Sequence, residues 1–211
     1  MKSMSDPDQF YSERVPTQWN RTLKDQAELA ALDESAQAML QEMQRVDATM
    51  KVLVEDPATD RTYLLNIANG EMSCDPEARR EPFLVLVHDL ETFETLERES
   101  GDSILGFLGA LAGQPEDMKL TVNRLRNLSE LNGRARLELA EGSPMSLEAR
   151  LGEGIQDPSS PACMLRLPSA VYAALKGGEL APQDAFLSGQ ITIEGDMNLA
   201  MQLALAAVSP D

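Results

Sequence analysis

The stretch Gly189-Gln190-Ile191-Thr192-Ile193-Glu194-Gly195-Asp196-Met197 decides how the C-terminal part of the chain is expected to fold. Its alternating residues between two glycines predict a β-strand with one buried face. Asp196 can cap a following helix by accepting hydrogen bonds from backbone N–H groups. The helix predicted from Met197 to Val208 has only Asn198 and Gln202 as polar residues. It therefore needs burial on two sides or an apolar ligand beside it.

Upstream of this stretch, one series of elements occurs twice. Strands are predicted at 50–55, 62–67 and 83–87, and again at 134–140, 146–151 and 163–167. Gly70 and Gly154 lie 84 residues apart, and other matching positions lie 79 and 80 residues apart. This near-constant offset predicts an internal duplication, and the alternative is two unrelated α+β halves. The second copy is expected to have one strand more, at 190–194, because the gap from Gly113 to Asp117 is short and contains a proline.

The run from Ala173 to Leu203, AALKGGELAPQDAFLSGQITIEGDMNLAMQL, resembles the C-terminal half of the sterol carrier protein lipid-binding domain. That family ends in a helix, a glycine, a Pro-containing turn, an apolar pair, a glycine, a strand, Gly-Asp and a final helix. The resemblance covers about residues 131–208 and is most specific over 163–203. Residues 25–130 resemble the family only through their repeat relation to the second copy, and they depart from its Gly-strand-Gly-Asp pattern.

The resemblance implies an α+β fold built from two tandem sterol-carrier-like repeats. Each repeat would have a mostly antiparallel mixed sheet covered by helices. The implied organisation is an N-terminal arm at 1–24, a degenerate first repeat at 25–130 and a second repeat at 131–211. The family has no catalytic residues to transfer to this chain.

The resemblance further implies an apolar tunnel in the second repeat, with the final helix as part of its wall. The residues expected to line it are Val171, Leu175, Phe186, Leu187, Ile191, Ile193, Met197, Met201 and Leu205. The expected function is non-catalytic binding or transfer of a sterol, fatty acyl or prenyl lipid. The alternative is an interaction or oligomerisation scaffold, or an accessory factor in a lipid pathway, with no ligand of its own.

Charge and composition argue against several other function classes. The chain has 18 Lys and Arg against 35 Asp and Glu, a net charge of −17, which disfavours nucleic-acid and anionic-membrane partners. One histidine, His88, cannot build a multi-histidine metal centre, and Cys74 and Cys163 form no CxxC pair. We therefore expect no metal, no cofactor and no enzymatic activity. Asp89 is expected to cap a helix rather than to act with His88 as a catalytic dyad.

The N-terminal residues lack the apolar core of a secretory signal, and the apolar stretch 104–112 is far shorter than the roughly 20 residues of a membrane span. We therefore expect a cytoplasmic protein without an integral membrane segment. The aromatic residues Phe10, Tyr11 and Trp19 suggest that the arm docks onto the domain, with a mobile arm as the alternative.

The strands of the second copy alternate between apolar and charged residues, which predicts one buried and one solvent-facing side of a sheet. In the first copy, Leu53, Leu64, Leu84 and Leu86 are expected on the solvent-facing side. We expect either a helix predicted at 25–47, or a protein partner or second copy of the chain, to cover them.

Overall fold

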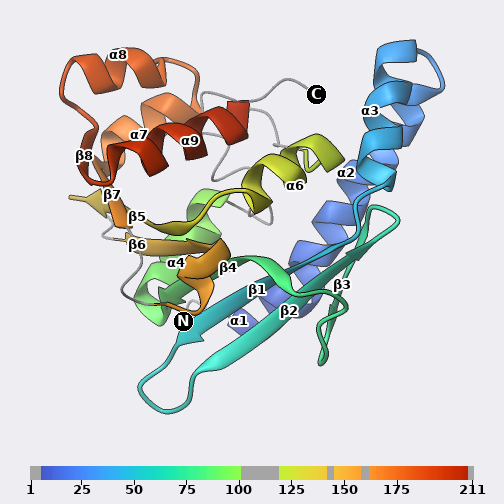
Figure 1. Cartoon of the computed structure of the whole chain (residues 1–211), viewed down its shortest axis with the longest axis horizontal. Helices are drawn as coiled ribbons and strands as arrows, with labels where there is room; N and C mark the ends of the chain where they lie inside the picture. Colours follow the sequence, from blue (N-terminus) through green and yellow to red (C-terminus); the bar gives the residue numbers. More distant parts are fainter. Residues whose placement is uncertain (1–5, 101–118, 142–144, 158–161, 209–211) are drawn as a thin grey trace, which may run out of the picture.

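The computed structural model describes residues 6–100, 119–141, 145–157 and 162–208 (Figure 1). Its helices are α1 (Pro7–Gln9), the π-helix η1 (Phe10–Arg14), α2 (Val15–Ala30), α3 (Glu34–Gln44), α4 (Leu90–Ser100), α6 (Val122–Ser129), the 3₁₀-helix η2 (Gly152–Ile155), α7 (Ser169–Lys176), α8 (Pro182–Leu187) and α9 (Met197–Val208). Its strands are β1 (Ala48–Glu55), β2 (Arg61–Ala68), β3 (Glu71–Asp75), β4 (Pro82–Asp89), β5 (Gly133–Ala140), β6 (Met145–Leu151), β7 (Ala162–Pro168) and β8 (Thr192–Gly195).

All of these strands form one mixed sheet in the order β3-β2-β1-β4-β6-β5-β7-β8. Within the described residues, β1·β4 and β5·β7 are parallel, and the other neighbouring pairs are antiparallel. A mostly antiparallel sheet with helices confirms the expected α+β class.

The two halves of the sheet have the same strand pairing. In the first half, β1 pairs with β2 antiparallel and with β4 parallel. In the second half, β5 pairs with β6 antiparallel and with β7 parallel. The antiparallel pair β4·β6 joins the halves into a continuous sheet. The common pairing agrees with the duplication that the sequence predicts, which itself remains a prediction.

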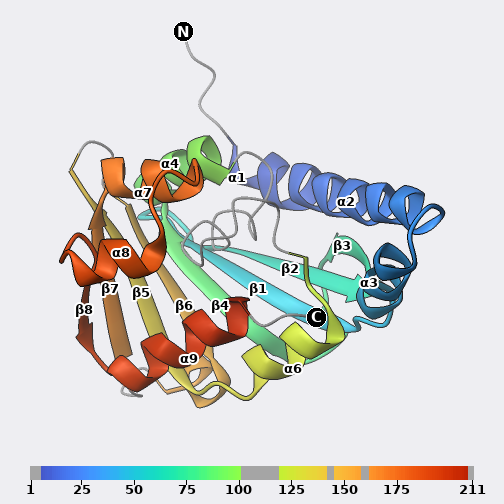
Figure 2. The same cartoon turned by 90° about the horizontal axis from the view of Figure 1, so that it is seen from above.

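The helices cover one face of the sheet, as Figure 2 shows for α4, α6, α7, α8 and α9. The main core lies between this face and the helices, and it combines strand residues of both halves with helix residues. Its members include Met50 and Leu86 from the first half, Leu137 and Leu151 from the second, and Tyr172 from α7. The predicted buried side of the second copy is confirmed, because Ala135, Leu137, Leu139, Leu147 and Leu151 are all buried, although Glu148 on the other side is buried as well.

The N-terminal segment packs onto the domain, so the docking expectation is confirmed. Phe10 and Tyr11 are fully buried in the main core, and the indole N–H of Trp19 donates to the carbonyl of Gly70 over 2.9 Å. The expected helix start at residue 25 is wrong, because α2 runs unbroken from Val15 to Ala30. A second helix, α3, begins where Asp33 accepts a hydrogen bond from the Ser35 N–H, so a cap divides the helix predicted at 25–47.

The first half has a strand, β3, that the sequence interpretation missed, so the described halves have four strands each. Asn69 and Gly70 both have positive φ, 54° and 80°, which makes a tight hairpin turn between β2 and β3. The apolar stretch 104–112 and the whole gap from Gly113 to Asp117 lie outside the described residues.

The expectation for Leu84 and Leu86 is also wrong. These residues pair with Met50 and Val52 of β1 and lie in the main core on the helix side. Because β4 is apolar on both faces, alternation alone could not determine which residues face the helices. The predicted helix 25–47 is therefore not needed to cover them.

Candidate functional site

Helix α9 is positioned by the turn that leads into it from β8. Gly195 has φ of +83°, and a Cβ atom there would lie 2.3 Å from the carbonyl oxygen of Ala162, so only glycine fits without strain. The Leu199 N–H donates to the Asp196 carboxylate over 3.0 Å, which confirms the predicted helix cap. The sequence motif thereby brings α9 back over the helix-covered face of the sheet.

One side of α9 packs onto the sheet and another remains uncovered. Leu199 and Ala200 are buried against Ala135 and Cys163. In contrast, Met197, Met201 and Leu205 recur every four residues and are 42%, 59% and 66% exposed. Helix α9 therefore presents an exposed apolar stripe, and we call these three residues the α9 stripe.

The other predicted lipid-site residues divide into three groups. Val171, Leu175 and Ile191 are buried in the main core, where they hold α7 and the start of the last strand in place. Ile193 is half-buried and packs beside α9. Phe186 and Leu187 of α8 are 44% and 82% exposed. The large apolar side chains that are exposed among the described residues are those of α8 and the α9 stripe, together with Leu29 and Leu32 near the α2–α3 turn.

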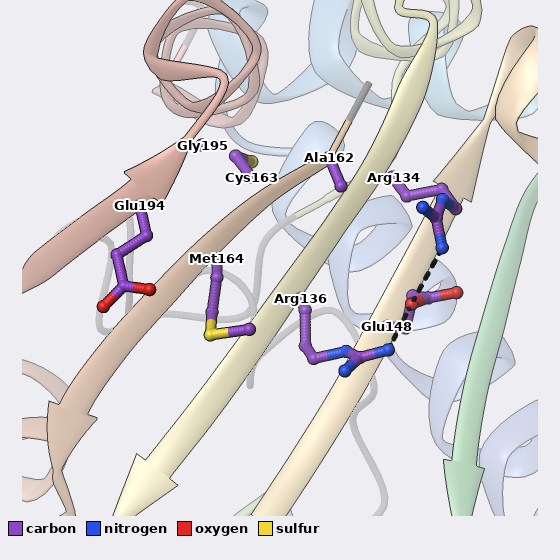
Figure 3. Close-up of a pocket in the computed structure, with 8 residues that line it drawn as sticks. All are labelled: Arg134, Arg136, Glu148, Ala162, Cys163, Met164, Glu194 and Gly195. Atoms are coloured by element: carbon purple, nitrogen blue, oxygen red, sulfur yellow. Dashed lines mark hydrogen bonds and ion pairs between the residues drawn. The ribbon is translucent and has the colours of Figure 1, made fainter. Parts of the chain in front are cut away.

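A second feature lies on the opposite face of the sheet, where a cavity of about 280 Å³ opens between β6, β5, β7 and β8 (Figure 3). It is lined by Arg134, Arg136, Glu148, Ala162, Cys163, Met164, Glu194 and Gly195. The alternation of the strands predicted that these charged residues form an ordinary solvent-facing side of the sheet. The one signal for a site was the Arg-x-Arg pattern on β5 in a strongly acidic chain.

Glu148 is the buried charge at this cavity. Its carboxylate accepts hydrogen bonds from Arg136 Nη2 over 2.9 Å and from Arg150 Nε over 2.7 Å. Burial raises the pKa of Glu148, but the hydrogen bonds from Arg150 and Arg136 outweigh this effect and leave its pKa below the usual value. Glu148 is therefore ionised at neutral pH.

His88 lies in the core rather than in a catalytic dyad. Its Nε2 is 2.6 Å from the hydroxyl oxygen of Tyr11, and its Nδ1 is 2.9 Å from the backbone carbonyl of Asp89. Burial lowers the pKa of His88. The Asp89 carboxylate instead accepts the Thr92 N–H over 2.7 Å, which confirms the predicted cap of α4. Burial also raises the pKa of the Cys163 thiol to about 11, so this thiol is protonated at neutral pH.

None of the helices in the described part of the chain is long and apolar enough to cross a membrane. No group of three or more His, Cys, Asp or Glu side chains in the same residues is arranged to hold a metal ion.

Comparison with known protein families gives a match to part of the chain. No curated protein matches the chain. Residues 118–207 match the SCP-2 sterol transfer family, and this range contains α6 through most of α9. It begins before residue 131, where the sequence interpretation started the second repeat. The C-terminal part of the chain, residues 118–207, is therefore a domain of the SCP-2 sterol transfer family.

Proposed function

We propose that the SCP-2 domain of this protein binds or transfers an apolar lipid of the sterol, fatty acyl or prenyl class without chemical conversion. The family match supports lipid binding or transfer in general. The observation that carries the proposal for this chain is the exposed apolar surface on α8 and α9, which lies inside the matched residues. It contains five of the residues that the sequence predicted for the lipid site: Phe186, Leu187, Met197, Met201 and Leu205.

The free energy of burying apolar side chains favours the binding of a lipid or another apolar surface to these residues. Burying a Leu, Met or Phe side chain contributes about 1.5–3 kcal/mol relative to leaving it in water. A lipid chain along the α9 stripe would remove several such side chains from water at once. Flexible methionines such as Met197 and Met201 suit an occupant of variable shape. The core residues Val171, Leu175 and Ile191 would then support the site rather than contact the lipid directly.

The second candidate is a scaffold whose α9 stripe contacts another protein. Apolar residues at four-residue spacing along one helix face also suit a helix–helix interface. If the protein is a scaffold, we expect a dimer or hetero-complex with no bound lipid. If it is a lipid carrier, we expect a bound lipid.

Native mass spectrometry of the purified full chain separates the two functions. A co-purifying lipid of a few hundred daltons on the monomer is the result that we expect. A ligand-free oligomer, with no added mass after incubation with fatty acid or sterol, would instead support the scaffold. Organic extraction followed by mass spectrometry of the extract would then identify the lipid class.

We also propose the division of the chain into an arm, a degenerate first repeat at 25–130 and a second repeat at 131–211. The equal strand pairing of the two halves supports it. A protein partner or a second copy on the first-repeat sheet belongs to the same proposal. On the open face of the sheet, which is the face opposite the helices, Leu53 and Leu64 are half-buried, and Val85 and Val87 are buried beside them.

A further inference from the structure

The cavity on the open face of the sheet has no part in the proposed lipid function, because the α9 stripe lies on the other face. In the close-up of Figure 3, the helices lie behind the strands and the cavity residues lie in front. Register places these residues together: Arg136 pairs with Glu148 on one side and with Met164 on the other, and Met164 pairs with Glu194.

Three arginines surround the single carboxylate of Glu148. Arg136 and Arg150 hydrogen-bond to it, one to each oxygen. Arg134 Nη1 is 3.9 Å from Glu148 Oε2, which is an ion-pair distance but too long for a hydrogen bond. One buried carboxylate therefore balances only part of the positive charge around it.

Arg134 is the arginine whose donors are least satisfied. Its Nε atom is buried and has no hydrogen-bond partner among the residues that the structure describes. A buried donor without a partner is rare in folded proteins, and it is stabilised when an acceptor reaches it. Arg134 also lines the cavity, so an acceptor held there would lie beside its guanidinium group.

The acidic residue on the far side of the cavity, Glu194, shares one arginine with Glu138. Glu194 accepts a hydrogen bond from Arg166 over 3.1 Å, and Arg166 also binds Glu138. Across the whole cluster, four arginines face three glutamates, which is a local positive balance in a chain of net charge −17.

We propose that this cavity binds a small oxyanion, a carboxylate or a phosphate monoester, through the guanidinium groups of Arg134 and Arg136. Guanidinium groups match such anions because their N–H donors form a planar fork. A volume of about 280 Å³ lies at the lower end of ligand sites, so the ligand is small. Ala162 and Met164 add a short apolar wall. The ligand comes from solution rather than from a membrane surface, because the net charge repels anionic lipids.

Titration of the purified full chain with inorganic phosphate at low ionic strength tests this proposal, with binding followed by amide NMR shifts. We expect saturable shifts centred on β5, β7 and β8. Arg134→Gln should weaken the affinity about tenfold or more, since it removes charge-assisted contacts. Arg126→Gln is the matched control because Arg126 is an exposed arginine of α6 that bonds Asn123, outside the cavity. Its affinity should stay within about twofold of the wild type.

A second variant keeps the charges and fills the space. Met164→Trp should weaken phosphate binding to a similar degree, so the proposal does not depend on Arg134→Gln folding well. Fatty-acid binding by both variants should be unchanged, and a failure of the lipid proposal would leave the phosphate result standing. The absence of saturable shifts in the wild type would overturn the anion site. Equal weakening by Arg126→Gln would overturn it too, and so would binding to phosphatidic acid vesicles without binding to free phosphate.

Discussion

The hydroxyl oxygen of Tyr11 lies 2.6 Å from Nε2 of His88, although the two residues are 77 positions apart, and both side chains are buried. Because Nδ1 faces the carbonyl of Asp89, the neutral ring donates its proton there and accepts the Tyr11 hydroxyl proton at Nε2. The chain's one histidine therefore attaches the N-terminal helices to β4.

His88→Ala should leave lipid binding nearly intact and lower stability. Removing the imidazole leaves the buried Tyr11 hydroxyl without its partner, which costs about 1–3 kcal/mol in addition to the lost packing. Tyr11→Phe is a milder companion because it keeps the ring. Urea denaturation measures the loss, and a fluorescent fatty-acid titration of the folded protein checks function. Loss of lipid binding in a folded His88→Ala protein would contradict the structural role.

The same histidine should make stability depend on pH. Burial lowers the pKa of His88 in the folded state below its unfolded value, so the unfolded chain binds the proton more readily. This contribution to stability is complete above the unfolded value of about 6.5 and decreases as the pH falls below it. We expect the urea midpoint to fall between pH 7.5 and 5.5 and to fall less in His88→Asn. Identical pH profiles for the two proteins would show that His88 does not titrate on unfolding.

Met201→Glu should reduce fatty-acid affinity by orders of magnitude. The substitution puts a carboxylate in the middle of the α9 stripe, and desolvating it beside a lipid costs several kcal/mol, while about 1.4 kcal/mol is a factor of ten. Gln202→Glu, one residue along the same exposed helix, adds the same charge outside the stripe and should bind normally. Oligomeric mass is measured on the same samples. Unchanged lipid binding, together with the conversion of an oligomer to a monomer, would favour the scaffold.

Gly195→Ala should destabilise the domain more than Gly189→Ala. Both glycines have positive φ, +83° and +73°, so each substitution introduces backbone strain of about 1–3 kcal/mol. Only at Gly195 does the new Cβ also meet a backbone oxygen, that of Ala162, whereas nothing lies within 4 Å at Gly189. Thermal melts of the two variants measure the difference. Equal melting temperatures would mean that the β7–β8 junction relaxes freely.

Local patterns predicted much of the fold. Alternation or short apolar runs predicted β1, β2, β4, β5, β6 and β7, and the caps at Asp89 and Asp196 were correctly predicted from their positions before helices. Strand β3 was missed, although Asn69-Gly70 is a hairpin signal, because the five-residue strand behind it is short. The break between α2 and α3 was missed because apolar spacing continues across Asp33.

For the candidate lipid site, too, the sequence predicted one part and the packing of the molecule decided the other. The apolar character of α9 follows from residues within one helix. The sequence alone therefore indicated an apolar surface that is stabilised when it is buried. Which of its residues are covered is a property of the packed molecule. Leu199 and Ala200 pack on the sheet, while the α9 stripe does not.

The sequence by itself determined the α+β class, most strands of each half and the final strand–glycine–helix unit, because hydrophobic period, turn residues and caps act over a few neighbouring positions. Only the tertiary structure decided that β4 and β6 join the halves, that Leu86 rather than Val87 faces the helices, and that Arg134 shares a cavity with Glu194. These features depend on strand register and on contacts between residues far apart along the chain. Apolar alternation does not encode them when both faces of a central strand are apolar.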